Sequence, residues 1–363
     1  MSGIQAEIGN LEAIVGSLSM SEKELFKRIF DIVVTKGRLY PPQGMRPWIE
    51  GQFGSVDRAL EQNIVRVTNL VTFEEALFNP LRASRPVEEH AGDEVSAAEI
   101  DNRQTDIFSD PLANTPEDTF GRIEGRYCIT ASNIAKYEGF HGVIIFKEPD
   151  PLRFTREQVI DYIDTGWRWA RKAHFIDPEA RYYFFMWNCG GRAGASLPHG
   201  HAQVTLGKRR PYARVEQLRC AALSYRNQYG VDYFDDLYRA HHAVGCGIET
   251  GGIRVLAYLT PVKEKEVVLM AHELGESFSE TLYEVLACFR DRMGVTFFNV
   301  ALFMPPLTRA EEDWSDFPTI ARVVDRGSAE SKASDIGAME LYASSVISGD
   351  PFEVARVVKE ALG

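Results

Sequence analysis

From about residue 127 onward, the apolar and polar positions of the chain follow two periods that predict an alternation of strands and helices. Short runs rich in β-branched and aromatic residues predict strands at 127–130, 142–146, 182–187 and 202–206. The capping box Thr155-x-x-Gln158 predicts the start of a helix that continues to about His174. This part of the chain therefore combines several strands with one long helix.

A similar series follows downstream. Strands are predicted at 254–259, 266–270 and 296–303, and Ser277-x-x-Glu280 predicts the start of a helix that ends near Gly294. Because the elements recur in a similar order, the sequence suggests a tandem duplication. Only the first series carries a cluster of histidines.

Two segments precede these series. Near the amino terminus, the capping box Ser21-x-x-Glu24 is followed by apolar residues at helical spacing, which predicts an amphipathic helix. These apolar residues are Leu25, Ile29, Ile32 and Val33. The segment from Glu88 to Asp118 contains ten acidic residues and a single Lys or Arg, Arg103, together with Gly, Pro and Asn. This composition predicts a long solvated loop.

Composition narrows the class of protein. The chain has 363 residues, 45% of them hydrophobic, which is enough for two packed units. Its five widely spaced cysteines form no Cys-x-x-Cys pair, and no basic, apolar leader or long apolar run occurs. We therefore expect a cytoplasmic protein without a membrane span. A formal charge of -12 argues against nucleic acid as the partner and favours a metabolite.

The histidine cluster is the main candidate for chemistry. His199 and His201 are two residues apart, so on a strand both point to one face, with Gln203 in line behind them. They follow the small-residue run 188–196, whose backbone N–H groups could approach phosphate oxygens closely. Neutral imidazole is nucleophilic near pH 7 and forms a phosphoramidate that can be transferred onward.

The local residues alone leave three interpretations of this cluster open. The histidines could supply a nucleophile, form half of a metal site, or support the strand structurally. The metal interpretation is the weakest, because no Cys, Asp or Glu lies nearby at ligand spacing.

A family resemblance separates these interpretations. The pattern Asn-x-Gly-x-x-x-Gly-x-x-x-x-His-x-His-x-Gln resembles the signature of the histidine triad superfamily. The residues in its register are Asn188, Gly190, Gly194, His199, His201 and Gln203. Upstream, Asn133-Ile134 and the segment 141–145 resemble the strand pair of the same family at the same spacing. Glutamine in the third position resembles the branch that contains galactose-1-phosphate uridylyltransferase and the nucleotide phosphorylases.

The resemblance implies roles for these residues. It implies that His201 carries the nucleotidyl group, that Gln203 donates to phosphoryl oxygens and that His199 assists. It also implies that Ser196 contacts phosphate and that Asn133 lies near the ribose. Because a glutamine amide cannot shuttle a proton, the branch favours transfer to a phosphate-bearing acceptor over hydrolysis.

One further match and one departure complete the resemblance. Arg82 and Arg85 resemble the branch's phosphate-binding arginines, although a solvated surface pair is an equally good interpretation. Many relatives hold a structural zinc through a Cys-x-x-Cys, but the corresponding stretch 106–111 has no cysteine. We therefore expect no metal and no cofactor, and a supporting role for His199.

Together, these observations predict an α+β fold of tandem histidine-triad-like repeats, each an antiparallel sheet packed against helices. Residues 1–75 are expected to form a helical extension, 76–210 the first repeat and 211–363 a degenerate second repeat. The expected activity is that of a nucleotidyltransferase or phosphorylase, which uses a nucleotide sugar or dinucleotide and a phosphate or sugar-phosphate acceptor. A histidine-triad hydrolase and a non-catalytic nucleotide-binding protein are the alternatives. The resemblance also implies a homodimer.

Overall fold

The structure is a computed structural model that describes residues 4–84, 106–327 and 336–363. Arg85 and most of the predicted loop 88–118 lie outside the described residues. Within the described part of that loop, the chain forms the short helix α6 (Pro111–Asn114), which Asp110 caps through a hydrogen bond to the backbone N–H of Ala113.

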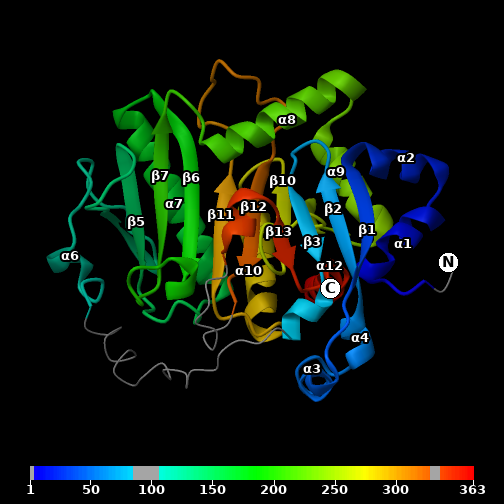
Figure 1. The fold of residues 1–363 in the computed structure, drawn as a ribbon. Helices are drawn as coiled ribbons and strands as arrows, with labels where there is room; N and C mark the ends of the chain where they lie inside the picture. Colours follow the sequence, from blue (N-terminus) through cyan, green and yellow to red (C-terminus); the bar gives the residue numbers. More distant parts are fainter. Residues whose placement is uncertain (1–3, 85–105, 328–335) are drawn as a thin grey trace.

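A nine-stranded antiparallel sheet forms the centre of the molecule (Figure 1). Its strand order is β4-β5-β7-β6-β11-β12-β10-β9-β8, so the strands of the first repeat occupy one half and those of the second repeat the other. The strands are β4 (Cys128–Ser132), β5 (Phe140–Phe146), β6 (Ala180–Cys189), β7 (His201–Lys208), β8 (Gly247–Thr250), β9 (Ile253–Ala257), β10 (Val267–Ala271), β11 (Phe298–Phe303) and β12 (Thr319–Asp325). The two predicted repeats thus share one continuous sheet, joined where β6 pairs with β11.

Long helices cover one face of this sheet. In the first repeat α7 (Arg156–Ile176) contacts β4, β5, β6 and β7, and in the second α10 (Glu276–Asp291) lies beside α7 and contacts β9, β10 and β12. The predicted capping box at Thr155 and Gln158 is confirmed. The helix α10 instead begins after Gly275, two residues before the predicted cap. The remaining long helices are α8 (Ala213–Tyr229), α9 (Tyr233–Val244) and α12 (Pro351–Leu362).

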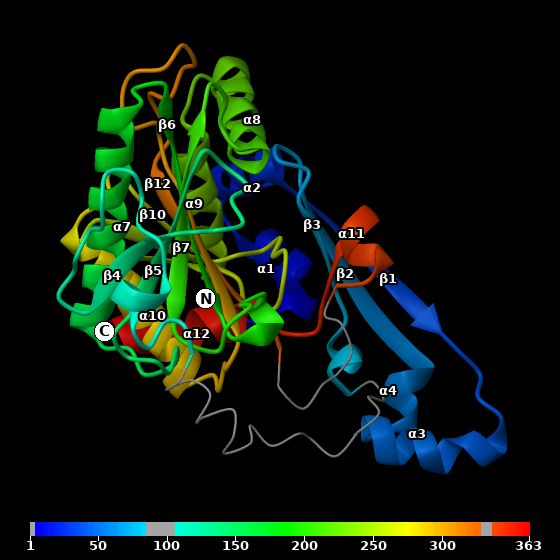
Figure 2. The same cartoon turned by 90° about the vertical axis from the view of Figure 1, so that its left-hand side faces the viewer.

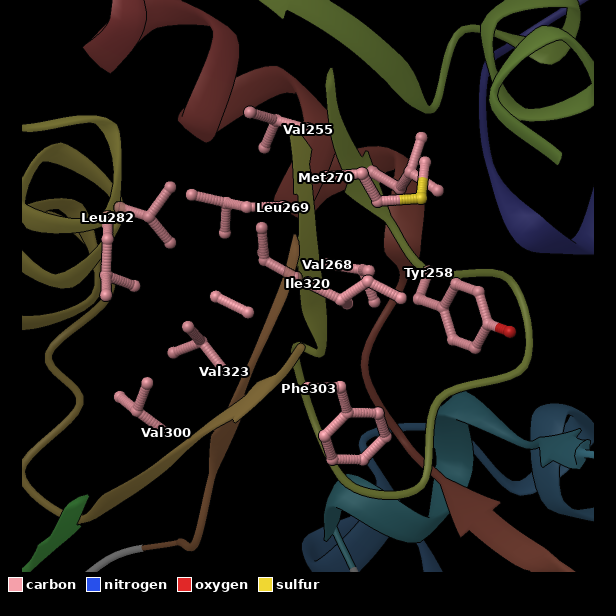
Figure 3. Close-up of a cluster of buried hydrophobic side chains, with 14 of the residues drawn as sticks. Val255, Tyr258, Val268, Leu269, Met270, Leu282, Val300, Phe303, Ile320 and Val323 are labelled. Atoms are coloured by element: carbon pink, nitrogen blue, oxygen red, sulfur yellow. The ribbon is translucent and has the colours of Figure 1, made fainter. Parts of the chain in front are cut away.

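The core of the second repeat lies between the sheet and α10. In Figure 3, Leu282 of α10 projects towards Leu269, Val300 and Val323, which come from three neighbouring strands. All four side chains are at most 1% exposed. Burial of a side chain of this size stabilises the fold by about 1.5–3 kcal/mol. This apolar face fixes the register of the strands, and hence the polar residues that appear on the opposite face.

A second sheet is separate from the nine-stranded one. Its order is β1-β2-β3-β13, formed by β1 (Phe30–Arg38), β2 (Glu61–Asn69), β3 (Glu75–Phe78) and β13 (Ser345–Ile347). In Figure 2, β1 and β2 run away from the central sheet towards the short helices α3 (Arg46–Phe53) and α4 (Val56–Leu60). The expected boundary at residue 76 falls within β3.

The amino-terminal region differs from the helical extension expected for residues 1–75. It is not wholly helical: α1 (Leu11–Ser17) and α2 (Met20–Ile29) are followed by the long strands β1 and β2. The capping box is formed by Ser19 and Glu22, two residues before the predicted one. Ile32 and Val33, which fit the helical spacing, lie in a β-branched run that pairs with β2 instead. Among the described residues, no helix is long and apolar enough to cross a membrane.

The buried His241 on α9 makes the stability of the fold depend on pH. Its Nδ1–H donates to the Leu237 carbonyl at 2.8 Å, and its Nε2 accepts from the Leu259 backbone N–H at 3.2 Å. Burial lowers the pKa of His241 from 6.5 to about 4. Below pH 6.5 the unfolded chain therefore binds a proton that the folded chain does not bind until about pH 4.

We expect this group to lower the free energy of unfolding by about 2 kcal/mol between pH 7 and pH 5. Urea unfolding of the wild type and of His241→Gln at both pH values measures the effect. The variant should lose less stability than the wild type on acidification. An equal loss in the two proteins would contradict the prediction.

Candidate active site

His201 is the first residue of β7, and its hydrogen bond fixes which ring nitrogen can react. Nδ1 lies 2.8 Å from the carbonyl oxygen of His199. Because a carbonyl only accepts, Nδ1 carries the proton and Nε2 keeps its lone pair. Nε2 has no hydrogen-bond partner among the described residues, and the residue is only 7% exposed. The ring is thus oriented and largely shielded from water.

Burial also sets the charge of His201. It lowers the pKa of His201 below its ordinary value, because the charged imidazolium loses solvation. The neutral ring therefore predominates at pH 7. A neutral, oriented imidazole is the form that a nucleophile requires.

His199 supports His201 through its backbone carbonyl and is held by two acceptors of its own. Its Nε2 donates to the Phe146 carbonyl at 2.9 Å, and its Nδ1 lies 3.2 Å from Asp106 Oδ1. These two contacts hold the ring of His199 in one orientation. Phe108 contacts the rings of both histidines edge-on.

Gln203 is oriented by two donors. His141 Nε2 lies 2.8 Å and Tyr137 Oη 3.3 Å from the amide oxygen of Gln203. When both donate, the oxygen is occupied and the NH2 group of Gln203 is left for an incoming acceptor. Asn133 Nδ2 lies 3.2 Å from the same His141 nitrogen, and its Oδ1 accepts from the Ala135 N–H. The structure thus brings Asn133, His141 and Gln203 together.

The small-residue run forms a tight loop between β6 and β7. Gly190 and Gly194 have φ angles of 81° and 98°, which residues with a side chain rarely adopt. The single turn η4 (Gly191–Ala193) lies between them, and the Gly190 carbonyl accepts from both Ala193 and Ala195. Ser196 follows this loop and is exposed. The predicted positions therefore surround the start of β7.

The second repeat contributes to this site through Asn299 on β11. Asn299 Nδ2 donates to Asn188 Oδ1 at 2.7 Å and to the Ala193 carbonyl at 2.8 Å. Its own Oδ1 accepts from Arg326 Nη1 at 2.6 Å. The side-chain amide of Asn299 thus connects Asn188 on the strand to the loop that contains Gly190 and Gly194, called the glycine loop below. With its oxygen occupied, Asn188 keeps its NH2 group as a donor.

Asn299 is expected to act on nucleotide binding. In Asn299→Ala, all three of these hydrogen bonds are lost, and we expect the affinity for a nucleoside monophosphate to fall about ten-fold. Calorimetric titration with AMP and UMP measures this. The matched control is Asn227→Ala, an exposed asparagine on α8. Equal affinities of Asn299→Ala and the wild type would rule out this role.

A cavity of about 310 Å³ lies beside His199. Ile145 pairs directly with His201, and Ile129 pairs with Ile145, so all three share one face of the sheet. Most of the lining is apolar; it comprises Phe108, Pro111, Ile129, Ile145, Phe146 and Pro149, with Ser109, Lys147 and His199. An aromatic ring fits such a lining.

Arg82 lies elsewhere. It is on the turn η3 (Pro80–Ser84) that follows β3 of the second sheet, and its side chain is exposed. Within the described part of this chain, no hydrogen bond or ion pair joins Arg82 to His201. Across the same described ranges, no group of three or more His, Cys, Asp or Glu residues is placed to hold a metal ion.

Several contributing residues were not found from the sequence. Asp106 lies at the end of an acidic stretch that gave no sign of its approach to His199. Asn299 lies in the second repeat, 111 positions from Asn188. The only available signal was that an asparagine interrupts the apolar strand 298–303. The partner of Gln203, His141, was part of the family pattern, but its role depends on the pairing of β5 with β7.

This arrangement, a continuous antiparallel sheet of two repeats with an oriented histidine at the start of a central strand, defines a class of fold. Solved structures share the architecture of the sheet and helices, and the histidine-triad-like α+β fold predicted from the sequence is confirmed. No protein-family model matches the sequence, and no curated protein matches it.

Three of the similar solved structures are a phosphorylase and two proteins of the uridylyltransferase type. An ADP-glucose phosphorylase from Arabidopsis thaliana with bound ADP-glucose is 15% identical in sequence to this chain, with a TM-score of 0.61, and the match covers 81% of this chain and 98% of the phosphorylase chain. A uridylyltransferase is 17% identical, with a TM-score of 0.56 over 68% of this chain and 88% of its own. A GalT-like protein from Arabidopsis thaliana is 15% identical, with a TM-score of 0.55 over 69% and 89%. At these identities, the similarity establishes the fold.

Proposed function

We propose that this protein is a nucleotidyltransferase of the phosphorylase type, which transfers a nucleotidyl group through a covalent intermediate on His201. The observation that carries the proposal is the 2.8 Å hydrogen bond from His201 Nδ1 to the His199 carbonyl. It leaves a neutral, oriented Nε2 beside a loop of small residues. The names of the similar structures, a phosphorylase and uridylyltransferases, support the same class.

The reaction proceeds in two displacements. Nε2 of His201 attacks the α-phosphorus of the donor; an N–P bond forms, and the P–O bond to the leaving phosphate breaks with its electron pair. The positive charge that develops on the His201 ring is stabilised by the His199 carbonyl. A phosphate oxygen of the acceptor then attacks the same phosphorus and the N–P bond breaks. A nucleotide sugar or dinucleotide is the proposed donor, and a phosphate or sugar phosphate the acceptor.

The surrounding residues have proposed roles in this reaction. The 310 Å³ cavity beside His199 would hold the base, because its lining is mainly apolar. The NH2 groups of Gln203 and Asn188, together with Ser196 and the backbone of the glycine loop, would donate to the phosphoryl oxygens. Asn133 would lie near the ribose. His199 would keep the ring of His201 oriented through its backbone carbonyl.

We also propose that the protein is a homodimer. The ribbon of β1 and β2 and the helices beyond it carry exposed apolar side chains, which mark a candidate interface. They are Val33, Val34, Leu39, Tyr40, Met45 and Trp48. Arg82 is linked to this region, because Gln52 on α3 donates to the Ser84 carbonyl. In a dimer, Arg82 of one chain would reach the active site of the other chain.

Light scattering during size-exclusion chromatography is expected to give twice the mass of one chain. The apolar surface on the β1–β2 ribbon is the physical reason, since a second copy would remove it from water. A mass of one chain at micromolar concentration would contradict the homodimer. We further propose a cytoplasmic location, which the five widely spaced cysteines of the sequence support.

The transferase is distinguished from a hydrolase by its products. With a nucleotide donor and orthophosphate, we expect a nucleoside diphosphate, because phosphate accepts the nucleotidyl group. Without orthophosphate or a sugar phosphate, turnover should stop once His201 is occupied. Continued release of nucleoside monophosphate without any acceptor would identify a hydrolase. Binding of nucleotides without turnover across a broad donor panel would identify a non-catalytic protein.

A further inference from the structure

A second cavity, of about 560 Å³, lies in the other half of the central sheet. Its walls come from the turn Thr72–Glu75, from β11 and β12, from α8 and from the segment Glu340–Ser345. The short helix α11 (Ala338–Tyr342) supplies part of this last wall. Figure 2 shows α11 and β3 on the side of the sheet opposite to α7 and α10. The volume is within the range of small-molecule sites.

This cavity opens on the same face of the sheet as the catalytic residues. Gln203 pairs with Met186, Met186 pairs with Ala301 and Ala301 pairs with Arg322, so these side chains form one row. Residues paired across antiparallel strands point to the same face. Three strand spacings separate Gln203 from Arg322, a distance of about 14 Å. Ala301 and Arg322 both line the cavity.

Phe73 at the rim of the cavity is held in an unfavourable position. Its φ angle is 60° and its side chain is 81% exposed. Left-handed backbone is unfavourable for a bulky residue, and an exposed phenyl ring recovers none of this cost through burial. The turn is held by the buried Asn69, whose side-chain oxygen accepts from the Val71 and Thr72 N–H groups. The fold thus presents an aromatic ring to the solvent at this rim, and Tyr342, which also lines the cavity, is 87% exposed.

The floor of the cavity is a buried network of polar side chains in which some hydrogen-bonding groups have no partner among the described residues. Arg322 Nη1 lies 2.6 Å from Glu74 Oε1, and its Nε lies 2.5 Å from Glu266 Oε1. Tyr258 Oη donates to the other Glu74 oxygen at 2.7 Å. Arg322 Nη2 and the hydroxyl of Thr260, a residue only 1% exposed, have no hydrogen-bond partner among the described residues. Buried polar groups of this kind are normally satisfied, which points to a ligand or solvent with hydroxyl groups.

The charges select the class of ligand. The lining holds four carboxylates and two guanidinium groups: Glu74, Glu75, Glu266 and Glu340, with Arg214 and Arg322. Arg322 is already paired with two of the carboxylates, so a phosphate group would meet a net negative surface. A purely apolar ligand would leave the polar floor unsatisfied. The hydroxyl groups of a ligand can donate to the carboxylates and accept from Arg322. If the ligand also contains a ring, the aromatic faces of Phe73 and Tyr342 can pack against it.

From this geometry we propose that the cavity binds an uncharged, polyhydroxylated ring, that is, a sugar. The sugar is either free or the glycosyl group of a nucleotide sugar whose phosphates lie at His201. Assigning it to the substrate rests on the proposed function, whereas the affinity of the cavity for a sugar does not. The second repeat would then be a binding unit on the same face as the catalytic repeat.

Saturation-transfer NMR with millimolar D-glucose, D-galactose, D-mannose and maltose tests the proposal. We expect transfer to at least one of these sugars and roughly ten-fold weaker binding in Phe73→Ala. Phe175→Ala, which removes a phenylalanine that is 83% exposed elsewhere, is the matched control and should bind like the wild type. Binding should also persist in His201→Ala, so failure of the proposed chemistry does not affect this readout.

Competition separates the two sources of the sugar. If the cavity holds the glycosyl group of a donor, UDP-glucose or ADP-glucose should displace the free sugar while UMP and AMP should not. Without displacement by either nucleotide sugar, the cavity binds a free sugar. No transfer to any of the four sugars, or equal transfer in Phe73→Ala, would overturn the proposal. Phe73-dependent binding of adenosine or uridine in place of the sugars would overturn it as well.

Discussion

In His201→Ala, turnover of the nucleotide donor is expected to fall by about 10⁴-fold or more. Without the imidazole, no group accepts the nucleotidyl moiety, and the two-step route is closed. Water or the acceptor would then have to attack the donor directly. The rate of product release with a donor and orthophosphate, followed by chromatography, measures the effect.

Two controls separate chemistry from folding. His272→Ala removes an exposed histidine of the second repeat and should leave turnover unchanged. The thermal midpoint of His201→Ala should stay close to that of the wild type, since Nδ1 makes the only hydrogen bond of this side chain among the described residues. If the folded His201→Ala variant keeps more than about a tenth of the wild-type rate, His201 is not the nucleophile.

In Gly190→Ala, we expect the glycine loop to be displaced and the rate of nucleotidyl transfer to fall by about a hundred-fold. A Cβ atom at this position would lie 2.5 Å from a carbon of the Phe297 ring, in a backbone conformation with a φ angle of 81°. The strain and the clash together amount to about 3 kcal/mol, which corresponds to this factor. Urea unfolding and the transfer rate measure the two consequences.

The neighbouring glycine provides the matched control. A Cβ atom on Gly191 would meet no atom within 4 Å, and its φ angle is not in the left-handed region. Gly191→Ala should therefore retain both stability and transfer. If Gly190→Ala and Gly191→Ala behave alike, the conformation of Gly190 does not determine the shape of the glycine loop.

The fold could be predicted from sequence where local signals agree. The capping box at Thr155 and the apolar runs gave α7 and most strands of the central sheet to within a few residues. The β1 strand was missed because Ile32 and Val33 satisfy helical spacing, and pairing with β2 decides between the two structures. The joining of two repeats through β6 and β11 depends on contacts between distant segments, which no local pattern contains.

The candidate site shows a similar division. The positions of His201, Gln203 and the two glycines followed from a motif, because they lie close together in the sequence. The residues that orient them come from other elements: Asp106 precedes α6, Tyr137 precedes β5 and Asn299 lies on β11. Their roles arise from strand pairing and loop placement. Arg82 is the opposite case. It also belongs to a sequence motif, but it is exposed and does not lie beside His201 of the same chain.

Intact-protein mass spectrometry tests the central claim most directly. The protein is mixed with UDP-glucose, ADP-glucose or a diadenosine polyphosphate, and the mass is recorded before and after an acceptor is added. We predict that the intact protein gains the mass of one nucleotidyl group, and that peptide mapping after digestion places it on the His201 peptide. The gain should be absent in His201→Ala and removed by orthophosphate or a sugar phosphate. Donor turnover with no such adduct in the wild type, or undiminished turnover in His201→Ala, would contradict covalent catalysis by His201.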